Sequence, residues 1–176
     1  AIDCCNGAGV EMITKLLTRL NCSITTIHCT PNGIFPHNPE PTVSNVKDLT
    51  GVVRKAKADI GFAMDPDADR VAIVSEKGVY IGEEYSMVLC ARHILGKKKG
   101  LVVTNVSTSR MIDDVAAEFG CQVQRTPVGE VNVADRMLDT GAVIGGEGNG
   151  GVIYPEVHCG RDSLTGIALM LQYMLE

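Results

Sequence analysis

The stretch Ile60–Val74, "IGFAMDPDADRVAIV", joins two apolar runs through a loop with three aspartates at alternate positions. The runs predict two buried strands with a tight connection between them. Carboxylates at alternate positions of a flat strand stand about 7 Å apart, too far to share one ion. A curled loop brings them together, and the intervening Pro66 and Ala68 suit a turn. We therefore expect a strand, a loop that gathers three carboxylates, and a second strand.

The three carboxylates, Asp65, Asp67 and Asp69, have no cysteine or histidine close by in the sequence. An all-oxygen ligand set favours a hard ion, Mg²⁺ or Ca²⁺. An EF-hand calcium loop is excluded because Arg70 stands where that loop needs glycine, and because a strand follows instead of a helix. We expect a magnesium site, with a solvated acidic turn as the alternative.

Arg70 follows the third aspartate directly. An arginine beside a carboxylate-bound Mg²⁺ can grip a phosphoryl group through two parallel hydrogen bonds. Simple ion pairing with Asp69 or Asp67 explains the arginine equally well. Magnesium held by few carboxylates completes its shell with water and phosphate oxygens. The loop therefore indicates phosphoryl transfer, and Arg70 is a candidate catalytic residue.

The chain on either side of this loop repeats one order of elements. Apolar spacing predicts strands at 1–5, 23–30, 58–64, 70–82, 100–106, 121–126, 142–148 and 151–155, with helices at 10–20, 43–57, 83–95, 109–120, 130–141 and 166–176. Alternation of this kind implies mostly parallel sheets covered by helices on both faces. The strand after each tight loop is expected to be an antiparallel edge. We predict an α/β fold of two similar three-layer α/β/α domains with mixed, mostly parallel sheets, at 1–82 and 83–176.

Composition narrows the class of protein. The chain has 176 residues, a net charge of −5 and no Lys/Arg run longer than Lys97–Lys99, which argues against nucleic-acid binding. No apolar run approaches the ~18 residues of a membrane span, and no secretory signal pattern opens the chain. Seven cysteines without a CxxC pair argue against a disulfide scaffold or a zinc site, and indicate free thiols and a cytoplasmic location. The four histidines (28, 37, 93 and 158) show no ligand spacing.

A second candidate loop is Gly145–Gly151, "GGEGNGG". Asn149-Gly150 between two apolar runs is a strong hairpin signal. The further glycines would let a ligand approach the backbone closely, and Glu147 could accept hydrogen bonds from sugar hydroxyls. Because ligand loops lie at the carboxyl ends of strands, we expect this loop and the acidic loop to share one site. Thr126–Gly129 fits either another site loop or an ordinary turn.

Taken in order, these motifs resemble the α-D-phosphohexomutases, the family of phosphoglucomutase, phosphomannomutase and phosphoglucosamine mutase. "DPDADR" resembles their metal loop, "DCCNGAG" the opening of their second domain, and "NGIFPHNPEP" the loop two strands later. "RTPVGE" and "GGEGNGG" resemble the two substrate loops of their third domain. The resemblance extends over nearly the whole chain.

The resemblance implies a reaction and a site. The reaction is the Mg²⁺-dependent interconversion of hexose 1-phosphate and hexose 6-phosphate, through a phosphoserine enzyme and a bisphosphorylated sugar. Such enzymes are isomerases of carbohydrate metabolism, of the intramolecular phosphotransferase type. The implied residues are Asp65, Asp67 and Asp69 for the metal, Arg70 for phosphate, and Glu147, Asn149, Thr126 and Gly129 for the substrate.

This sequence departs from the family pattern at three places. In many members the sugar loop has a serine where Asn149 stands and a histidine at the place of Gly151, and Pro127 often corresponds to a lysine. These changes leave open whether glucose, mannose or glucosamine phosphate is bound, and affect the reaction less.

Two family motifs are missing from the 176 residues. Family members have four domains, and this chain is expected to be a fragment with the second and third. The phosphoserine motif Ser-His-Asn-Pro of the first domain is not found, since "PHNP" at Pro36–Pro39 has proline in place of the serine. The phosphate-binding loop of the fourth domain is not found either. We expect hexose phosphate and the missing first and fourth domains as partners, and no mutase activity from this chain alone.

Two other functions fit parts of the sequence. An aspartyl-nucleophile phosphatase would use Asp65 to attack phosphorus and Asp67 as the acid. Such enzymes also need later lysine and acidic loops, which the sequence does not show. A non-enzymatic metal- or sugar-binding module is the third interpretation.

Overall fold

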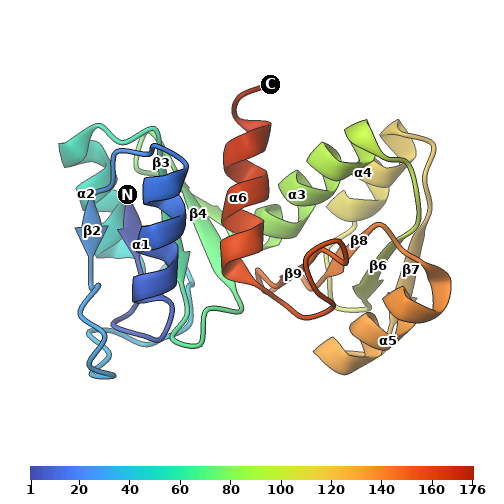
Figure 1. Ribbon diagram of the computed structural model, residues 1–176, viewed down its shortest axis with the longest axis horizontal. Helices are drawn as coiled ribbons and strands as arrows, with labels where there is room; N and C mark the ends of the chain where they lie inside the picture. Colours follow the sequence, from blue (N-terminus) through green and yellow to red (C-terminus); the bar gives the residue numbers. More distant parts are fainter. The chain divides into compact units, whose positions relative to one another are not determined.

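The computed structural model describes residues 1–176 and divides into two compact units, Ala1–Glu83 and Glu84–Glu176 (Figure 1). The elements of the first unit are β1 Ile2–Asp3, α1 Val10–Arg19, β2 Thr26–Ile27, α2 Lys47–Ala56, β3 Ile60–Met64, β4 Val71–Ser75 and β5 Tyr80–Gly82. Those of the second are α3 Glu84–Lys97, β6 Val102–Asn105, α4 Met111–Glu118, β7 Val123–Thr126, α5 Glu130–Thr140, β8 Ile144–Gly146, β9 Val152–Ile153 and α6 Ser163–Tyr173. None of the helices combines the length and apolar character needed to cross a bilayer.

The first unit is built on a five-stranded sheet in the order β2-β1-β3-β4-β5. Strand β1 pairs in parallel with β2 and with β3, so the carboxyl ends of these three strands meet at one edge. Strand β4 returns antiparallel to β3 after the acidic loop. This edge therefore carries Asp3 from β1, the segment after β2, and the acidic loop after β3.

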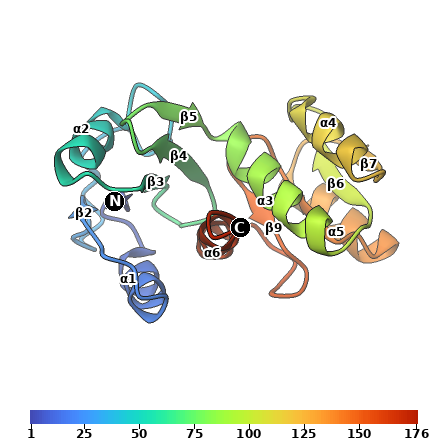
Figure 2. The ribbon, with the colours of Figure 1, turned by 90° about the horizontal axis from the view of Figure 1, so that it is seen from above.

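Helices cover both faces of this sheet, α1 on one side and α2 on the other (Figure 2). On the α2 face, Leu49 and Val53 pack with Ala63 of β3 and Val74 of β4, and all four are buried. Helix α1 buries Ile13 and Leu17. Ala63 of β3 thus faces α2, whereas the next residue, Met64, lies at the start of α1, where its Cε would be 2.7 Å from a Cβ at Gly9. Successive residues of β3 face opposite layers, as expected for a strand buried on both faces.

Two predictions about strands in this unit are wrong. The expected single strand at 70–82 is a hairpin, because Gly78 takes φ +66° in a turn that separates β4 from β5. As a result β5, and not β4, is the edge strand. The strand expected at 23–30 is reduced to Thr26–Ile27, because His28 takes a left-handed backbone with φ +49°, which ends the extended conformation.

The second unit has a four-stranded sheet in the order β7-β6-β8-β9. Strand β6 pairs in parallel with β7 and β8, and β9 runs antiparallel to β8 as the predicted edge. The order repeats β2-β1-β3-β4 of the first unit, so the predicted internal repeat is confirmed. The predicted α/β class with mixed sheets is confirmed as well.

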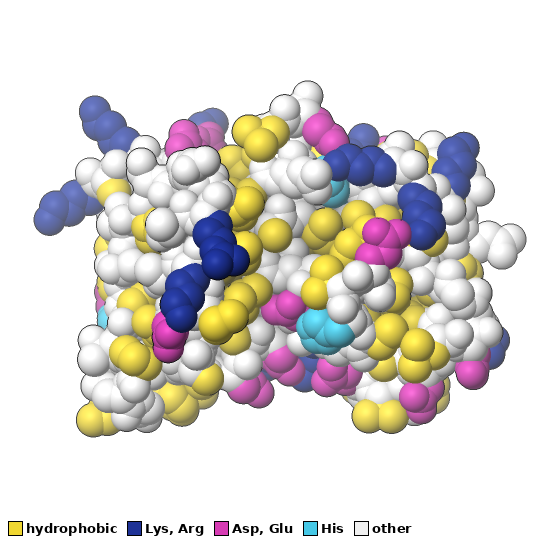
Figure 3. Space-filling view, in the orientation of Figure 1, with side chains coloured by type: hydrophobic (Ala, Val, Ile, Leu, Met, Phe, Trp, Pro, Cys, Tyr) yellow, Lys and Arg dark blue, Asp and Glu magenta, His cyan; other side chains and the backbone are white.

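Two successive glycines of β8 show which helices cover each face of the sheet in the second unit. A Cβ at Gly145 would meet Met137 of α5, whereas one at Gly146 would meet Met87 of α3. Helices α5 and α3 therefore cover opposite faces, with α4 and α6 packed against α3. On the surface, no continuous basic band crosses the face drawn in Figure 3, where Lys and Arg side chains stand in small separate groups.

Candidate functional site

Asp65 organises the acidic loop from its buried position at the end of β3. Its side chain is only 1% exposed, and Oδ1 accepts hydrogen bonds from the backbone amides of Asp69 (3.1 Å) and Arg70 (3.0 Å). The backbone closes the loop as well, since the Asp65 amide donates to the Arg70 carbonyl at 3.2 Å. The carboxylate thus holds the loop that follows it.

The loop curls as the sequence predicts and gathers its three carboxylates. Ala68 takes φ +62°, and one carboxylate oxygen each from Asp65, Asp67 and Asp69 lies within 4.8 Å of the other two. Asp65 is buried, Asp69 half-buried and Asp67 exposed. An all-oxygen set with an exposed member fits Mg²⁺, which keeps several water or phosphate ligands.

The sequence suggested that Arg70 pairs with Asp69 or Asp67. In the structure its nearest partner is the third aspartate of the loop, Asp65. Its Nε donates to Asp65 Oδ2 at 2.6 Å and lies 3.6 Å from Asp69 Oδ1. Its Nη1 lies 4.0 Å from Glu40 Oε1. Burial lowers the pKa of Arg70, but the hydrogen bond to Asp65 and the surrounding carboxylates outweigh it and raise the pKa, so the guanidinium stays charged.

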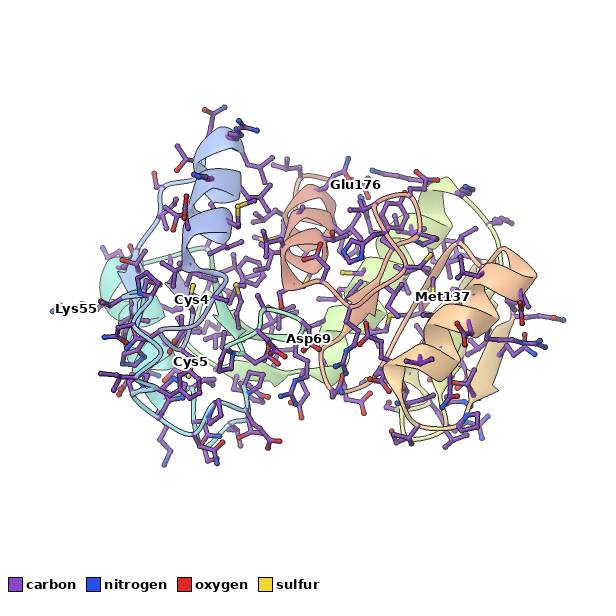
Figure 4. The ribbon with its side chains drawn as sticks, turned by 60° about the horizontal axis from the view of Figure 1, so that its bottom comes forward. Cys4, Cys5, Lys55, Asp69, Met137 and Glu176 are labelled. Atoms are coloured by element: carbon purple, nitrogen blue, oxygen red, sulfur yellow. The ribbon has the colours of Figure 1, made fainter.

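The turn after β1 supports the acidic loop. The Ala8 amide donates to the Pro66 carbonyl at 2.7 Å, and a Cβ at Gly7 would lie 2.3 Å from that same oxygen. Glycine is therefore required at position 7 by close approach of two backbones. Figure 4 labels Cys5 and Asp69, which belong to these two loops. Burial, with the charges of Asp3 and Asp65, raises the pKa of Cys5 to about 11, so its thiol is not a ready nucleophile.

Glu147 is the centre of the glycine loop in the second unit and is only 3% exposed. Its Oε1 accepts from Asn105 Nδ2 (2.6 Å) and from the Gly129 amide (3.2 Å). Its Oε2 accepts from Arg161 Nη1 (2.6 Å) and from Asn149 Nδ2 (3.4 Å). A carboxylate has about four acceptor sites, so these donors fill them.

The structure brings three of the four predicted substrate residues together. Glu147, Asn149 and Gly129 are joined by the hydrogen bonds just described. Thr126 is not part of this network: it is 7% exposed, and its hydroxyl donates to the Pro127 carbonyl at 3.0 Å.

Sequence reasoning missed Arg161, Asn105 and Glu84. Arg161 precedes α6, whose N-cap Asp162 accepts from the Leu164 amide at 2.8 Å. Glu84 accepts from the Ser109 amide at 3.0 Å. The only signal for Arg161 in the sequence is its place beside a helix cap, which does not reveal a partner fourteen residues earlier.

The glycines of this loop also make room for the protein itself. A Cβ at Gly146 would lie 2.2 Å from the Gly151 carbonyl. A Cβ at Gly148 would lie 2.6 Å from Glu84 Oε1, and one at Gly151 would lie 2.2 Å from Arg161 Cδ. The loop is therefore packed tightly against its own unit.

Two family models match the chain in the same order as the two units. The model described as phosphoglucomutase/phosphomannomutase alpha/beta/alpha domain II matches residues 1–78, and that of domain III matches residues 82–176. The chain belongs to the phosphoglucomutase/phosphomannomutase family. The resemblance seen in the sequence motifs is thereby confirmed.

Individual members of this family agree with the assignment. The chain is 40% identical to a probable phosphoglucosamine mutase of Methanopyrus kandleri over 99% of its length, and 39% identical to a phosphoglucomutase/phosphomannomutase of Thermococcus kodakarensis over 97%. It superposes on the crystal structure of a putative phosphomannomutase from Thermus thermophilus with a TM-score of 0.88 at 30% identity, over 98% of this chain. The chain spans 39%, 38% and 41% of these three proteins, respectively.

Proposed function

We propose that this chain provides the metal loop and the sugar-recognition loop of a phosphohexomutase. The complete enzyme would interconvert hexose 1-phosphate and hexose 6-phosphate through a phosphoserine and a bisphosphorylated sugar. Residues 1–82 and 83–176 would form its second and third domains. The observation that carries the proposal is the convergence of Asp65, Asp67 and Asp69 within 4.8 Å in a chain of this family.

The acidic loop would hold Mg²⁺ through its three carboxylates. Bound there, the ion would offset negative charge on a phosphoryl group. Arg70 would act beside it: because Nε is anchored on Asp65, the guanidinium is held at the carboxylate cluster, and its Nη groups are the donors we assign to phosphate. A fixed guanidinium loses less side-chain entropy when it binds phosphate than a mobile one.

The glycine loop would recognise the sugar through Glu147 and Asn149, next to Gly129 and Thr126. Glu147 is held in place by Asn105 and Arg161 at 2.6 Å each. The bond from the Asn149 amide is the longest of its hydrogen bonds, at 3.4 Å. This amide is therefore the donor that a sugar hydroxyl would most easily replace.

The geometry of Asp65 argues against an aspartyl-nucleophile phosphatase. A nucleophilic carboxylate must present an oxygen to phosphorus. Asp65 is 1% exposed, Oδ1 accepts two backbone amides, and Oδ2 accepts from Arg70. One lone pair of Oδ2 remains for an ion held by the loop, but no oxygen is exposed for in-line attack on phosphorus. We therefore expect no covalent adduct on Asp65 with beryllium fluoride; an adduct there would favour the phosphatase.

The metal assignment can be tested by NMR on the 176-residue chain. Millimolar Mg²⁺ should shift the amide signals of Asp65–Arg70, and Asp67→Asn should weaken the apparent affinity at least tenfold. Asp135→Asn, an exposed aspartate on α5, is the matched control and should change nothing. Unmoved amides at Asp65–Arg70, or an equal effect of both substitutions, would contradict the assignment.

The reaction can be tested by grafting. This chain would replace the segment of the Methanopyrus kandleri relative with which it aligns, and interconversion of hexosamine 1- and 6-phosphates would be assayed. We expect an active graft, a strongly impaired Asp67→Asn graft, and no activity from the 176 residues alone. A folded, Mg²⁺-binding graft without activity would contradict the proposed reaction, and an active isolated chain would contradict the need for a phosphoserine elsewhere.

A further inference from the structure

The first unit contains a second cluster of ligand-type side chains, made of Asp3, His28 and His37. One ligand atom from each lies within 4.8 Å of the other two. Asp3 ends β1, His28 directly follows β2, and His37 belongs to the connection between β2 and α2. Because β1 and β2 are parallel, their carboxyl ends deliver Asp3 and His28 to the same edge. The four histidines show no ligand spacing along the sequence, and this cluster of His28 and His37 with Asp3 forms only in the folded chain.

The Asp3 carboxylate is the fixed centre of this cluster. It is 1% exposed, and its Oδ1 accepts from the Cys5 amide at 2.9 Å. Its Oδ2 lies 2.9 Å from His28 Nδ1 and 3.2 Å from His37 Nε2. The two imidazoles are about four-fifths buried, with exposed side-chain fractions of 19% and 17%. One oxygen thus faces two ring nitrogens in a mostly enclosed space.

The second nitrogen of each ring also faces an acceptor. His37 Nδ1 lies 2.8 Å from the Asn38 carbonyl, and His28 Nε2 lies 3.9 Å from Asp48 Oδ2. A neutral imidazole carries only one N–H. If His37 donates from Nδ1 to Asn38, its Nε2 presents a lone pair to the Asp3 oxygen. Two lone pairs at this distance repel unless a cation lies between them, so the arrangement calls for positive charge at Asp3 Oδ2.

We propose that Asp3 Oδ2, His28 Nδ1 and His37 Nε2 form a site for a divalent transition-metal ion of the zinc class. Zinc bonds of about 2.0–2.1 Å in tetrahedral geometry place neighbouring ligand atoms about 3.3 Å apart. The two distances to Asp3 Oδ2, 2.9 and 3.2 Å, need only a small expansion. A hydrogen bond from the far ring nitrogen of His37 to a backbone carbonyl is the usual support of a metal-bound histidine. Water would take the fourth position.

Ligand chemistry separates this site from the acidic loop. Imidazole nitrogens favour zinc and related ions, whereas three carboxylates favour magnesium. His28, which supplies one of the two nitrogens, also has a left-handed backbone with φ +49°. This conformation is uncommon for residues other than glycine. The bound ion would tie the connection from β2 to α2, which contains no helix or strand, to the end of β1.

The test is a Zn²⁺ titration of the 176-residue chain against a chromophoric chelator, with millimolar Mg²⁺ present to occupy the acidic loop. Co²⁺ serves as a spectroscopic probe, because tetrahedral cobalt with nitrogen ligands absorbs visible light. The test variants are His28→Gln and His37→Gln. His158→Gln, a histidine of the second unit with a single carboxylate neighbour at 3.4 Å, is the matched control. Asp67→Asn checks that the acidic loop is not the site measured.

We expect one Zn²⁺ per chain, bound at least tenfold more weakly in each of the two test variants and unchanged in His158→Gln and Asp67→Asn. The visible Co²⁺ band should disappear in the same two variants. Absence of Zn²⁺ binding at tens of micromolar, or binding that the two substitutions leave unchanged, would overturn the proposal. Neither outcome depends on the proposed mutase function.

Discussion

The acidic loop and the glycine loop occupy the same position in two similar units, and they are built in different ways. The acidic loop, Asp65–Arg70, connects β3 to the antiparallel strand β4. The glycine loop, Gly145–Gly151, begins with the last two residues of β8 and leads to the antiparallel strand β9. Each contains a buried carboxylate next to an arginine. In the acidic loop, the buried Asp65 and its partner Arg70 are five residues apart.

Glu147 of the glycine loop draws its partners from much further along the chain. Arg161 is 14 residues away, Gly129 is 18, and Asn105 is 42. The comparison shows that the buried carboxylate of a loop can be fixed by contacts within that loop, as for Asp65, or by contacts from several helices and strands, as for Glu147. Contacts within the loop can be recognised as a local sequence motif, whereas contacts from several elements depend on the fold of the whole unit.

The largest effect is expected from Arg161→Met. The substitution leaves the Glu147 carboxylate, 3% exposed, without its cation, and an uncompensated buried charge costs about 3 kcal/mol. Hydrogen exchange of the β6 and β8 amides would report the loss in the second unit alone. Arg110→Met, at an exposed arginine before α4, should stay within about 0.5 kcal/mol. Equal protection in both variants would show that Glu147 does not need this partner.

Gly7→Ala should weaken the acidic loop by overpacking. The new methyl group would lie 2.3 Å from the Pro66 carbonyl, and the clash with backbone should cost about 2 kcal/mol. Hydrogen exchange of the β3 and β4 amides measures this loss of stability. Gly51→Ala is the matched control, since nothing lies within 4 Å of that position in α2 and alanine favours a helix. An unaffected β3 in Gly7→Ala would mean that the two loops can separate freely.

A pair of substitutions separates support of the acidic loop from metal binding. Asp65→Asn keeps an acceptor for the two backbone amides but loses the charge that faces Arg70, so we expect about 1.5 kcal/mol of lost stability. Asp67→Asn, at an exposed position, should change stability by less than about 0.5 kcal/mol. Both should weaken Mg²⁺ binding, as measured by the NMR titration. A loss of stability in Asp67→Asn equal to that in Asp65→Asn would contradict this division of roles.

A smaller loss of stability than in Arg161→Met, Gly7→Ala or Asp65→Asn is expected at Asn149. Its Oδ1 accepts from the Gly151 amide at 3.1 Å, and its amide reaches Glu147 only at 3.4 Å. Asn149→Ala should therefore cost about 0.5–1 kcal/mol in the second unit, by denaturant unfolding. In the graft described above, if it is active, the loss of binding free energy for the sugar phosphate should exceed the loss in the free energy of unfolding. A stability loss as large as that of Arg161→Met would place Asn149 in the core of the Glu147 network.

Most of the fold could be predicted from the sequence. Apolar periodicity and turn residues predicted six helices, the repeated order of strands, and the antiparallel return after each loop. These signals are local, because each helix or strand is favoured by residues within a few positions of one another. The errors, at β2 and at the β4–β5 hairpin, arose where a single residue, His28 or Gly78, adopts a positive φ.

The sequence by itself determined the repeated α/β/α plan and the curled acidic loop, since Asp65, Asp67 and Asp69 are close along the chain and converge through one turn. Only the tertiary structure decided the four donors around Glu147 and the cluster of Asp3, His28 and His37. The two histidines lie 25 and 34 positions from Asp3. Their encounter depends on strand order and on the path of a connection, and no local spacing encodes either.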